Sequence, residues 1–290
     1  MMKLSICIPT YNRLACLNNC LNSILIAKKN NYNFNFEVCI SDNCSKENVK
    51  EIIDKYSSSL DISFNKNYNN LGLGVNILKA VSLAKGDYVW ILGNDDLLLP
   101  NTFIYLEKLF RDNTIVDFFY INSFHLDSSF VLNGHQPFDT NNLPNKMKKF
   151  SNYPKSFQSN FFDLVNHNIS FDFMLGMFLI IFKKKIWDKN LSKIDQSSIE
   201  DKKTYSTFEN TAPHIIIWSS GFKNSKAYFH SKPLSVNTHG VREWVDLYPF
   251  VESIRIPEVL DYYRSAGLPL YKYLYYKNFA LRKLFISLFQ

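Results

Sequence analysis

The chain has 290 residues, of which 46% are hydrophobic, so it can form one large or two small globular domains with a sizeable core. Its formal charge of +7 favours an anionic partner such as a nucleotide or an acidic membrane surface. No run of 18 apolar residues is present, so we expect no membrane-spanning helix. The positive charge is dispersed and no nucleic-acid-binding motif accompanies it, which argues against a nucleic-acid partner.

All five cysteines lie within the first 44 residues, and none has the spacing that would complete a zinc site. We therefore expect reduced thiols and a cytoplasmic location. The chain enters a predicted strand almost at once, so we expect no signal peptide.

The first 120 residues alternate short apolar strands with amphipathic helices. Strands are predicted at residues 4–8, 36–40, 60–64, 88–92 and 116–120. Helices are predicted between them, through residues 14–25, 49–53, 75–81 and 104–110. This order predicts an α/β fold with a mostly parallel sheet and helices on both faces. Ligands of such sheets bind beyond the carboxyl ends of the strands.

The remaining chain is less regular. Residues 123–154 are rich in Asn, Asp, Pro and Lys and predict a long loop with irregular strands. Helices are predicted at residues 156–166, at 184–189, from about 213 and over 257–290. Strands are predicted at residues 177–182, 227–229 and 234–236, and residues 192–207 predict a polar loop.

Two adjacent carboxylates, Asp95 and Asp96, follow the predicted strand at residues 88–92. Neighbouring like charges call for a cation. Oxygen ligands on a loop suit Mg²⁺ or Mn²⁺, which usually also binds substrate phosphates. The alternative is electrostatic support for the helix that begins near Pro100.

Three other loops carry polar residues at the same predicted edge. Pro9-Thr10-Tyr11-Asn12 follows the first strand, and Ser41-Asp42-Asn43-Cys44-Ser45 follows the second. Asn70-Leu71-Gly72 precedes the third helix. Each also has a purely structural explanation. The first segment could be a plain turn, the second an Asx-turn at Asp42, and the third a loop in which glycine permits a backbone turn.

Together, and in this order, these segments resemble the family 2 glycosyltransferases of the bacterial surface-polysaccharide type, which have the GT-A fold. The resemblance covers residues 3–110 well and implies a single nucleotide-binding domain with a helical C-terminal extension. It implies that residues 1–120 bind the nucleotide-sugar donor and residues 121–242 the acceptor, with an extension at 243–290.

The resemblance also implies roles for individual residues. Asp42 would accept a hydrogen bond from the nucleobase, and Thr10 and Tyr11 would line the base and ribose. Asn94 would lie near the ribose or sugar, and Asp95, supported by Asp96, would hold Mn²⁺ or Mg²⁺. The remaining residues assigned to the donor are Pro9, Arg13, Asn70 and Gly72. For Arg13, a contact with phosphate and a salt bridge at a helix start are both open. The chain departs from the family at Gly93 and Asn94, where many members have Asp, so we expect weaker metal affinity.

The general base of the family is an acidic residue that opens a helix. The candidates here are Glu209 and Asp201, and we favour Glu209 because it directly precedes a predicted helix, although helix electrostatics alone explain an acid there. His214 could contact the acceptor, but it lies on an apolar run where a packed histidine is the simpler interpretation. His239 and Arg242 could contact the diphosphate, with an ordinary loop histidine as the alternative for His239.

The favoured function is inverting transfer of a sugar from a nucleotide sugar to a hydroxyl of a glycan or lipid-linked acceptor in surface polysaccharide synthesis. The alternatives are a nucleotidyltransferase and a non-catalytic nucleotide-sugar-binding protein. The aromatic and basic tail at residues 261–290 suits a peripheral contact at the inner face of the cell membrane. A helix packed on the core, or on the second subunit of a homodimer, is equally compatible with this tail.

Overall fold

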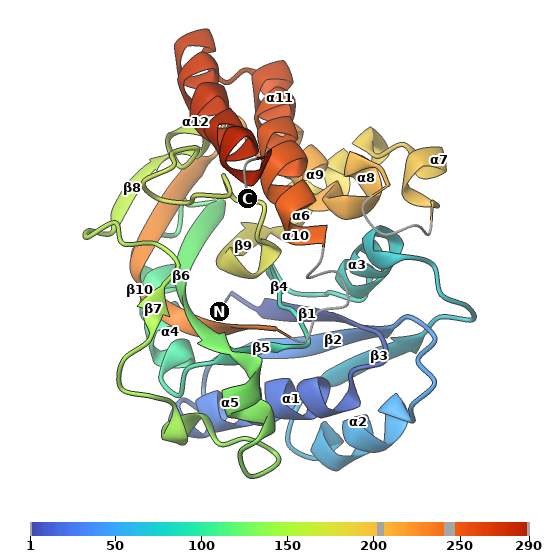
Figure 1. The fold of residues 1–290 in the computed structure, drawn as a ribbon. Coiled ribbons are helices and arrows are strands. Elements are labelled where there is room, and N and C mark those ends of the chain that lie inside the picture. The colour runs from blue at the N-terminus through green and yellow to red at the C-terminus, as the bar shows by residue number, and fades with distance from the viewer. Residues whose placement is uncertain (1, 202–205, 241–246, 289–290) are drawn as a thin grey trace.

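The protein was analysed as a computed structural model that describes residues 2–201, 206–240 and 247–288. Within them, ten strands form one sheet with helices on both faces (Figure 1). The strands are β1 (Leu4–Thr10), β2 (Phe36–Asp42), β3 (Ile62–Lys66), β4 (Tyr88–Ile91), β5 (Asp96–Leu98), β6 (Phe118–Asp127), β7 (Lys148–Lys149), β8 (Phe157–Asn160), β9 (Ile180–Lys183) and β10 (Lys226–His239). Their order is β3-β2-β1-β4-β9-β6-β10-β5, with β7 beside β6 and β8 beside β10.

The first half of the sheet is parallel, as the alternating pattern predicts. β1 pairs in parallel with β2 and β4, and β2 with β3. Every residue of β1 and β2 is buried, because helices cover both faces of a parallel sheet. These helices are α1 (Leu14–Asn30), α2 (Val49–Ser57), α3 (Leu73–Ser82) and α4 (Thr102–Asp112). In Figure 1, α1 and α2 lie on one face of the β1–β3 region and α3 on the other.

The second half joins the first through non-local pairs. β9 lies antiparallel between β4 and β6, and β10 runs parallel to β6. β5 pairs antiparallel with β10 at the far edge. β6 crosses the expected division after residue 120, so both halves of the chain share one sheet.

The structure changes several local predictions. Residues 156–166 are not a helix. They form β8 and a single 3-10 turn, because half-buried and exposed side chains alternate along Phe157–Asn160 as on an edge strand. The strands expected at 227–229 and 234–236 are one long strand, β10, with a register irregularity around Pro233. β5, three residues long, was not predicted.

The predicted long loop begins with the extension of β6 to Asp127 and the short helix α5 (Ser128–Leu132). The other helices are α6 (Lys184–Asn190), α7 (Gln196–Ile199), α8 (Phe208–Thr211), α9 (Pro213–Gly221), α10 (Tyr248–Phe250), α11 (Ile256–Ala266) and α12 (Leu270–Leu288). α11 and α12 form a hairpin on the opposite side of the molecule from α1 and α2 (Figure 1).

The buried hydrophobic residues form one main cluster that reaches from β1 to α12, where Tyr276 and Ala280 belong to it. A small second cluster contains Leu97, Val131, Phe138 and Val236. It joins β5, β10 and α5. Among the described residues, no helix has both the length and the apolar character needed to cross a membrane.

Candidate active site

Polar side chains from three loops meet at the carboxyl edge of the parallel strands, as predicted. Thr10 and Asp42 are paired residues at the ends of β1 and β2. The Asn94 side chain, after β4, donates a hydrogen bond from Nδ2 to Thr10 Oγ1 at 2.8 Å. All three side chains are at most 5% exposed. Three strand ends therefore form one fixed polar edge.

Asp42 presents one carboxylate oxygen that the protein does not use. Its Oδ1 accepts hydrogen bonds from the backbone N–H of Ser45 at 3.0 Å and from Ser45 Oγ at 2.5 Å. Its Oδ2 is buried and has no hydrogen-bond partner among the described residues. The nearest cation is Lys66 Nζ, 3.9 Å away. Because a buried carboxylate oxygen without a donor is costly, Oδ2 marks a place where a ligand can donate.

A network of asparagine side chains supports the loops around Asp42. Asn43 Nδ2 donates to Asn70 Oδ1 at 2.7 Å, and the backbone N–H of Leu71 donates to Asn43 Oδ1 at 2.9 Å. Asn67 Nδ2 donates to Asn76 Oδ1 at 3.0 Å, and Asn76 Nδ2 donates to the Thr10 carbonyl at 3.3 Å. The network ties the turn before α3 to the ends of β1 and β2.

Sequence reasoning missed Asn43, Asn67 and Asn76 as supporting residues. They lie in Asn-rich stretches that look like ordinary polar loops, and only the fold reveals that they are buried.

The other residues assigned to the donor have more structural roles. Pro9 is buried inside β1 opposite Ser41, so its ring fills the sheet and offers no polar contact. Tyr11 follows β1 and is half-buried. The Asn70 side chain accepts the N–H of Gly72 at 2.9 Å, and Gly72 has φ +83°, a conformation that favours glycine.

Asp95 is a largely buried carboxylate at the same edge of the sheet. It is 7% exposed, and its Oδ2 lies 3.4 Å from Arg13 Nη1 at the start of α1. Its backbone carbonyl accepts a 2.6 Å hydrogen bond from Thr238 Oγ1 in β10. Strands from both halves of the chain thus hold this residue.

Asp96, predicted as a second metal ligand, has a structural role instead. It belongs to β5 and is 1% exposed. Its Oδ2 accepts the N–H of Gly93 at 2.9 Å, and its Oδ1 accepts from Asn237 Nδ2 at 2.7 Å. A Cβ at Gly93 would lie 2.7 Å from both Asp95 Oδ1 and Asp96 Oδ2. The departure at Gly93 thus has a steric reason, because the two carboxylates fold back over this position.

The residues present fit a weakly held Mg²⁺ or Mn²⁺. The described residues contain no cluster of three or more His, Cys, Asp or Glu side chains that could hold a metal. Magnesium is commonly bound by one or two carboxylates together with substrate phosphates. Asp95 can supply one such carboxylate, and the remaining ligands would come from a diphosphate and water.

The two candidate bases belong to the short helix α8 and to the segment before it, and α8 packs on the start of α3. Glu209 is half-buried in the first turn of α8, and its Oε1 accepts the Tyr262 hydroxyl at 2.7 Å. Asp201 is exposed, and its Oδ2 accepts Ser206 Oγ at 2.6 Å. Asn210 Nδ2 donates to the Asp201 carbonyl at 2.9 Å and so links the two acids.

The helix α8 lies close to the carboxyl edge of the parallel strands through Gly74. A Cβ on Gly74 would lie 3.1 Å from the Asn210 carbonyl oxygen, so α8 sits tightly against the first turn of α3. Tyr262, which stacks on Phe208 with ring centroids 4.4 Å apart, fixes the orientation of Glu209. Burial, together with the bond to Glu209, raises the pKa of the Tyr262 hydroxyl, so this residue stays protonated and donates.

His214 is a packed histidine, the simpler of the two interpretations given above, and it offers no surface to an acceptor. Its ring is 3% exposed, and its Nε2 lies 2.8 Å from the Leu175 carbonyl oxygen. Burial lowers the pKa of His214 to about 4, so the ring is neutral and packed beside Trp218. His239 is exposed at the end of β10, with its ring centroid 6.3 Å from that of His125. Arg242 lies outside the described residues.

Solved structures similar to this chain share its fold. The structure of residues 1–349 of TarS from S. aureus has a TM-score of 0.62 and 18% identity, over 97% of this chain and 70% of that one. A mannosyltransferase from Pyrobaculum calidifontis, solved with GDP-Man and Mn²⁺, has a TM-score of 0.54 and 14% identity, over 97% and 72%. The expected GT-A fold is therefore confirmed.

Sequence comparison gives closer relatives over shorter stretches. Abequosyltransferase RfbV of Salmonella typhimurium is 44% identical over 108 residues, which is 37% of this chain and 32% of that protein. The chondroitin synthase of Pasteurella multocida is 40% identical over 118 residues, or 39% of this chain and 12% of that protein. These matches span a third or less of the relatives' own length. The sequence profile described as "Glycosyl transferase family 2" matches residues 5–180, well over half of the chain, and the chain therefore belongs to this family.

Proposed function

We propose that this protein transfers a sugar from a nucleotide-sugar donor to a hydroxyl group of a glycan or lipid-linked acceptor, with inversion at the transferred carbon. The observation that carries the proposal is the unused Oδ2 of Asp42 at the edge where Thr10, Asn94 and Asp95 meet. A nucleobase N–H that donates to this oxygen would satisfy the buried carboxylate. Family membership favours this activity over the nucleotidyltransferase alternative.

The donor would extend from Asp42 towards Asp95. The base would lie at Asp42 and Tyr11, and the ribose near Thr10 and Asn94. The diphosphate would lie near Arg13, whose guanidinium is already at the edge. Negative charge develops on the leaving diphosphate during transfer, and a cation at this position stabilises it.

Mn²⁺ or Mg²⁺ is the cofactor that this arrangement favours, with Asp95 as its protein ligand. A bound divalent cation would neutralise the charge of the departing diphosphate. Arg13 would contribute a second positive charge next to the diphosphate. This charge would compensate for the weaker metal binding expected because Gly93 replaces the Asp of many family members.

We assign Glu209 as the general base that takes the proton of the acceptor hydroxyl. Its carboxylate is held by Tyr262 and lies on the helix that packs against the donor edge. Asp201, whose carbonyl accepts a hydrogen bond from Asn210 of α8, is the alternative base.

A binding screen followed by a product assay tests the proposal. UDP-, GDP-, CDP- and dTDP-sugars with Mn²⁺ should be compared by thermal shift. One nucleotide class should raise the unfolding temperature and should release nucleoside diphosphate slowly by hydrolysis. If no class raises the unfolding temperature, the donor assignment fails. Tight binding without any release or transfer would instead support the non-catalytic alternative.

The proposed localisation is cytoplasmic with a peripheral membrane contact through α12. Leu270, Tyr271, Leu274 and Tyr275 are between 53% and 70% exposed on one side of this helix. Leucine and tyrosine suit the headgroup layer of a bilayer. Lys272 and Lys277 are paired with Asp163 and Asp261, so exposed apolar surface would contribute more to the contact than these two charges.

A further inference from the structure

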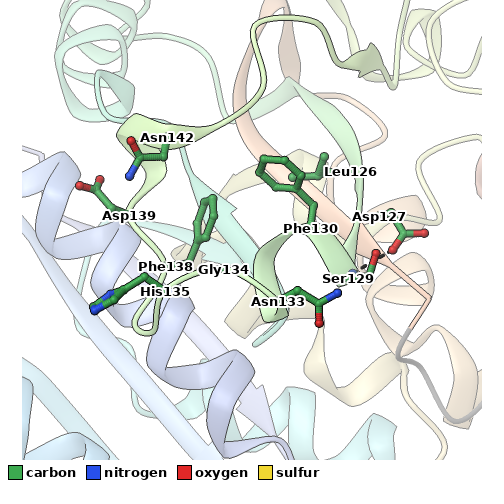
Figure 2. A pocket seen from close by; sticks show the side chains of 10 residues that line it. All are labelled: Leu126, Asp127, Ser129, Phe130, Asn133, Gly134, His135, Phe138, Asp139 and Asn142. Atoms are coloured by element: carbon green, nitrogen blue, oxygen red, sulfur yellow. Dashed lines mark hydrogen bonds between the residues drawn. The ribbon is translucent and has the colours of Figure 1, made fainter.

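An open cavity of about 860 Å³ lies between α5 and the loop that follows it (Figure 2). Its volume falls within the range of ligand pockets, roughly 300–1,000 Å³. None of the residues assigned above to the donor, metal or base lines it. It is therefore a separate feature that needs its own explanation.

The lining combines aromatic rings with neutral and acidic polar groups. The Phe130 ring is 45% exposed, and its centroid lies 6.0 Å from that of the buried Phe138. In Figure 2 the two rings stand between Asp139 and Asn142 on one side and Asp127 and Ser129 on the other. Asn133 and Asn142, which also line the cavity, are exposed. Exposed ring surface and exposed amide groups are thus available to a ligand.

The wall of this cavity is held in place by the core. Phe138 belongs to the small cluster with Leu97 and Val236. Asn19 and Asn22 of α1 hold its backbone on both sides, since the Phe138 N–H donates to Asn19 Oδ1 at 2.7 Å and its carbonyl accepts from Asn22 Nδ2 at 2.9 Å. Gln136 Nε2 donates to the Val131 carbonyl at 2.7 Å and so ties the loop to the end of α5. A preformed wall of this kind lowers the entropy cost of binding.

The cavity lies beside the catalytic edge. Thr238 donates to the Asp95 carbonyl and is the register partner of Leu126, which lines the cavity. Adjacent strands are about 5 Å apart, so Leu126 on the rim is one inter-strand spacing from Thr238, the residue that holds Asp95. Ser128 and Val131, on the other side of α5, line a small space together with Asp95. A chain of sugars in the cavity could therefore reach the reaction centre.

The charge of the lining selects a class of ligand. The cavity contains Asp127 and Asp139 but no lysine or arginine. A second cavity, of about 520 Å³, is lined by Lys148, Lys149 and Lys232 and by no acid. An anionic ligand would be attracted to the second cavity and repelled from the first. A neutral sugar has an apolar C–H face that can stack on Phe130 and hydroxyl groups that can donate to carboxylates.

We propose that this cavity is a subsite for neutral sugar units of the acceptor, beyond the unit that receives the new sugar. The proposal rests on the function proposed above and adds the chemical class of the acceptor. Phe130 supplies the stacking surface, and Asn133 and Asn142 supply amide groups for hydroxyls. Asp127 and Asp139 accept hydrogen bonds from further hydroxyls.

Binding of the full-length protein to an array of neutral, sulfated and phosphorylated oligosaccharides tests the proposal directly. We expect binding to neutral members, weakened about tenfold or more in Phe130→Ala and in Asn133→Ala. Tyr32→Ala is the matched control, because Tyr32 is a 71% exposed aromatic residue in the loop before β2, at the opposite end of the strands. Circular dichroism should show the same unfolding temperature for all variants.

Several outcomes would overturn the subsite. These are absence of binding to neutral oligosaccharides, a preference for the phosphorylated or sulfated members, or equal binding by Phe130→Ala and the wild type. A thermal-shift screen with sugar nucleotides on the same variants distinguishes failure of the subsite from failure of the proposed transferase function. Donor binding should be unchanged in Phe130→Ala. If the wild type binds oligosaccharides but no sugar nucleotide, the transferase proposal fails while the glycan site remains.

Discussion

The guanidinium of Arg13 lies 3.4 Å from the Asp95 carboxylate, so the first residue before α1 neutralises the acid that follows β4. Both side chains are largely shielded, at 20% and 6% exposure. Before any ligand arrives, the charge of Asp95 is thus already balanced, and its repulsion from Asp96 is reduced. A divalent cation without nucleotide has to compete with Arg13, which explains why metal and donor should bind together.

Asp95→Asn should lower the transfer rate by roughly 10²-fold or more, because the cation at the departing diphosphate loses its protein ligand. The free energy of unfolding should stay within about 1 kcal/mol of the wild type, since Asn has the same size and the lost ion pair with Arg13 is offset by the lost repulsion from Asp96. Nucleoside diphosphate release and urea denaturation measure the two quantities. Asp188→Asn, which removes a surface pair with Lys184, is the control. Full activity in excess EDTA would contradict the metal assignment.

Asp42→Asn should weaken donor binding by about 10- to 100-fold, because a charge-assisted hydrogen bond to the nucleobase is worth about 1.5–3 kcal/mol. The Ser45 hydroxyl can still donate to the amide oxygen, so the loop should keep its shape. Calorimetry with the nucleotide class found by thermal shift gives the affinity. Asp61→Asn, at the opposite end of the strands beside Lys3, should bind like the wild type. Unchanged affinity in Asp42→Asn would show that the nucleobase does not bind at Asp42.

Glu209→Gln should retain donor affinity and lose turnover by roughly 10²- to 10⁴-fold, as expected for removal of a general base. Asp201→Asn, which changes the alternative base, is the matched comparison. Tyr262→Phe should show a smaller loss of turnover, because the carboxylate remains but is no longer held by the phenol hydroxyl. If Asp201→Asn loses turnover and Glu209→Gln keeps it, the base is Asp201.

The stability of the protein should fall as the pH falls from about 6.5 to about 4. Burial lowers the pKa of His214 to about 4, while the unfolded chain binds a proton at its histidines below about 6.5. Between these values the unfolded state holds more protons, so the stabilisation present above pH 6.5 is progressively lost. His230, whose pKa burial also lowers to about 4, adds to the effect.

His214→Gln isolates the contribution of one histidine. A glutamine amide can still donate to the Leu175 carbonyl but does not titrate. The difference between the wild type and this variant should change by up to about 3 kcal/mol across the pH range. Urea midpoints at several pH values provide the measurement. A difference that is independent of pH would show that His214 has the same pKa in the folded and unfolded states, contrary to the effect of burial.

Leu270→Glu combined with Leu274→Glu should abolish flotation with anionic liposomes without unfolding the protein, because both side chains are more than half exposed. Ile104→Glu combined with Ile115→Glu, at two exposed positions outside α12, is the control with the same change in charge. If the double variant is a monomer where the wild type is a dimer, and its flotation is unchanged, α12 is a subunit interface instead.

The tail at residues 261–290 contributes to the core of the protein. Tyr263 is fully buried and donates to the Phe173 carbonyl, and Tyr276 and Ala280 lie in the main core. One face of the tail is core and the other is exposed, so sequence composition alone could not separate the two interpretations.

The parallel half of the fold was predictable because its apolar strands and amphipathic helices alternate locally. Thr10, Asp42, Asn94 and Asp95 were expected to meet because parallel strands end at the same edge. β5 was not predictable, since its three residues become a strand only by pairing with β10, about 140 residues away. For the same reason Asp96 looked like a free ligand, although Asn237 in β10 occupies its Oδ1.

The path of β10 has a consequence for engineering this enzyme. Along its length it pairs with β6, β8 and β5. Near its end it contacts both Asp95 and Leu126, on the rim of the cavity beside α5. Exchanging residues 121–242 for those of a relative would replace Asn237 and Thr238 together with the acceptor surface. A chimaera designed to change only the acceptor should therefore keep β10 of this protein. Only the segment between β6 and β8 should be exchanged for that of the relative.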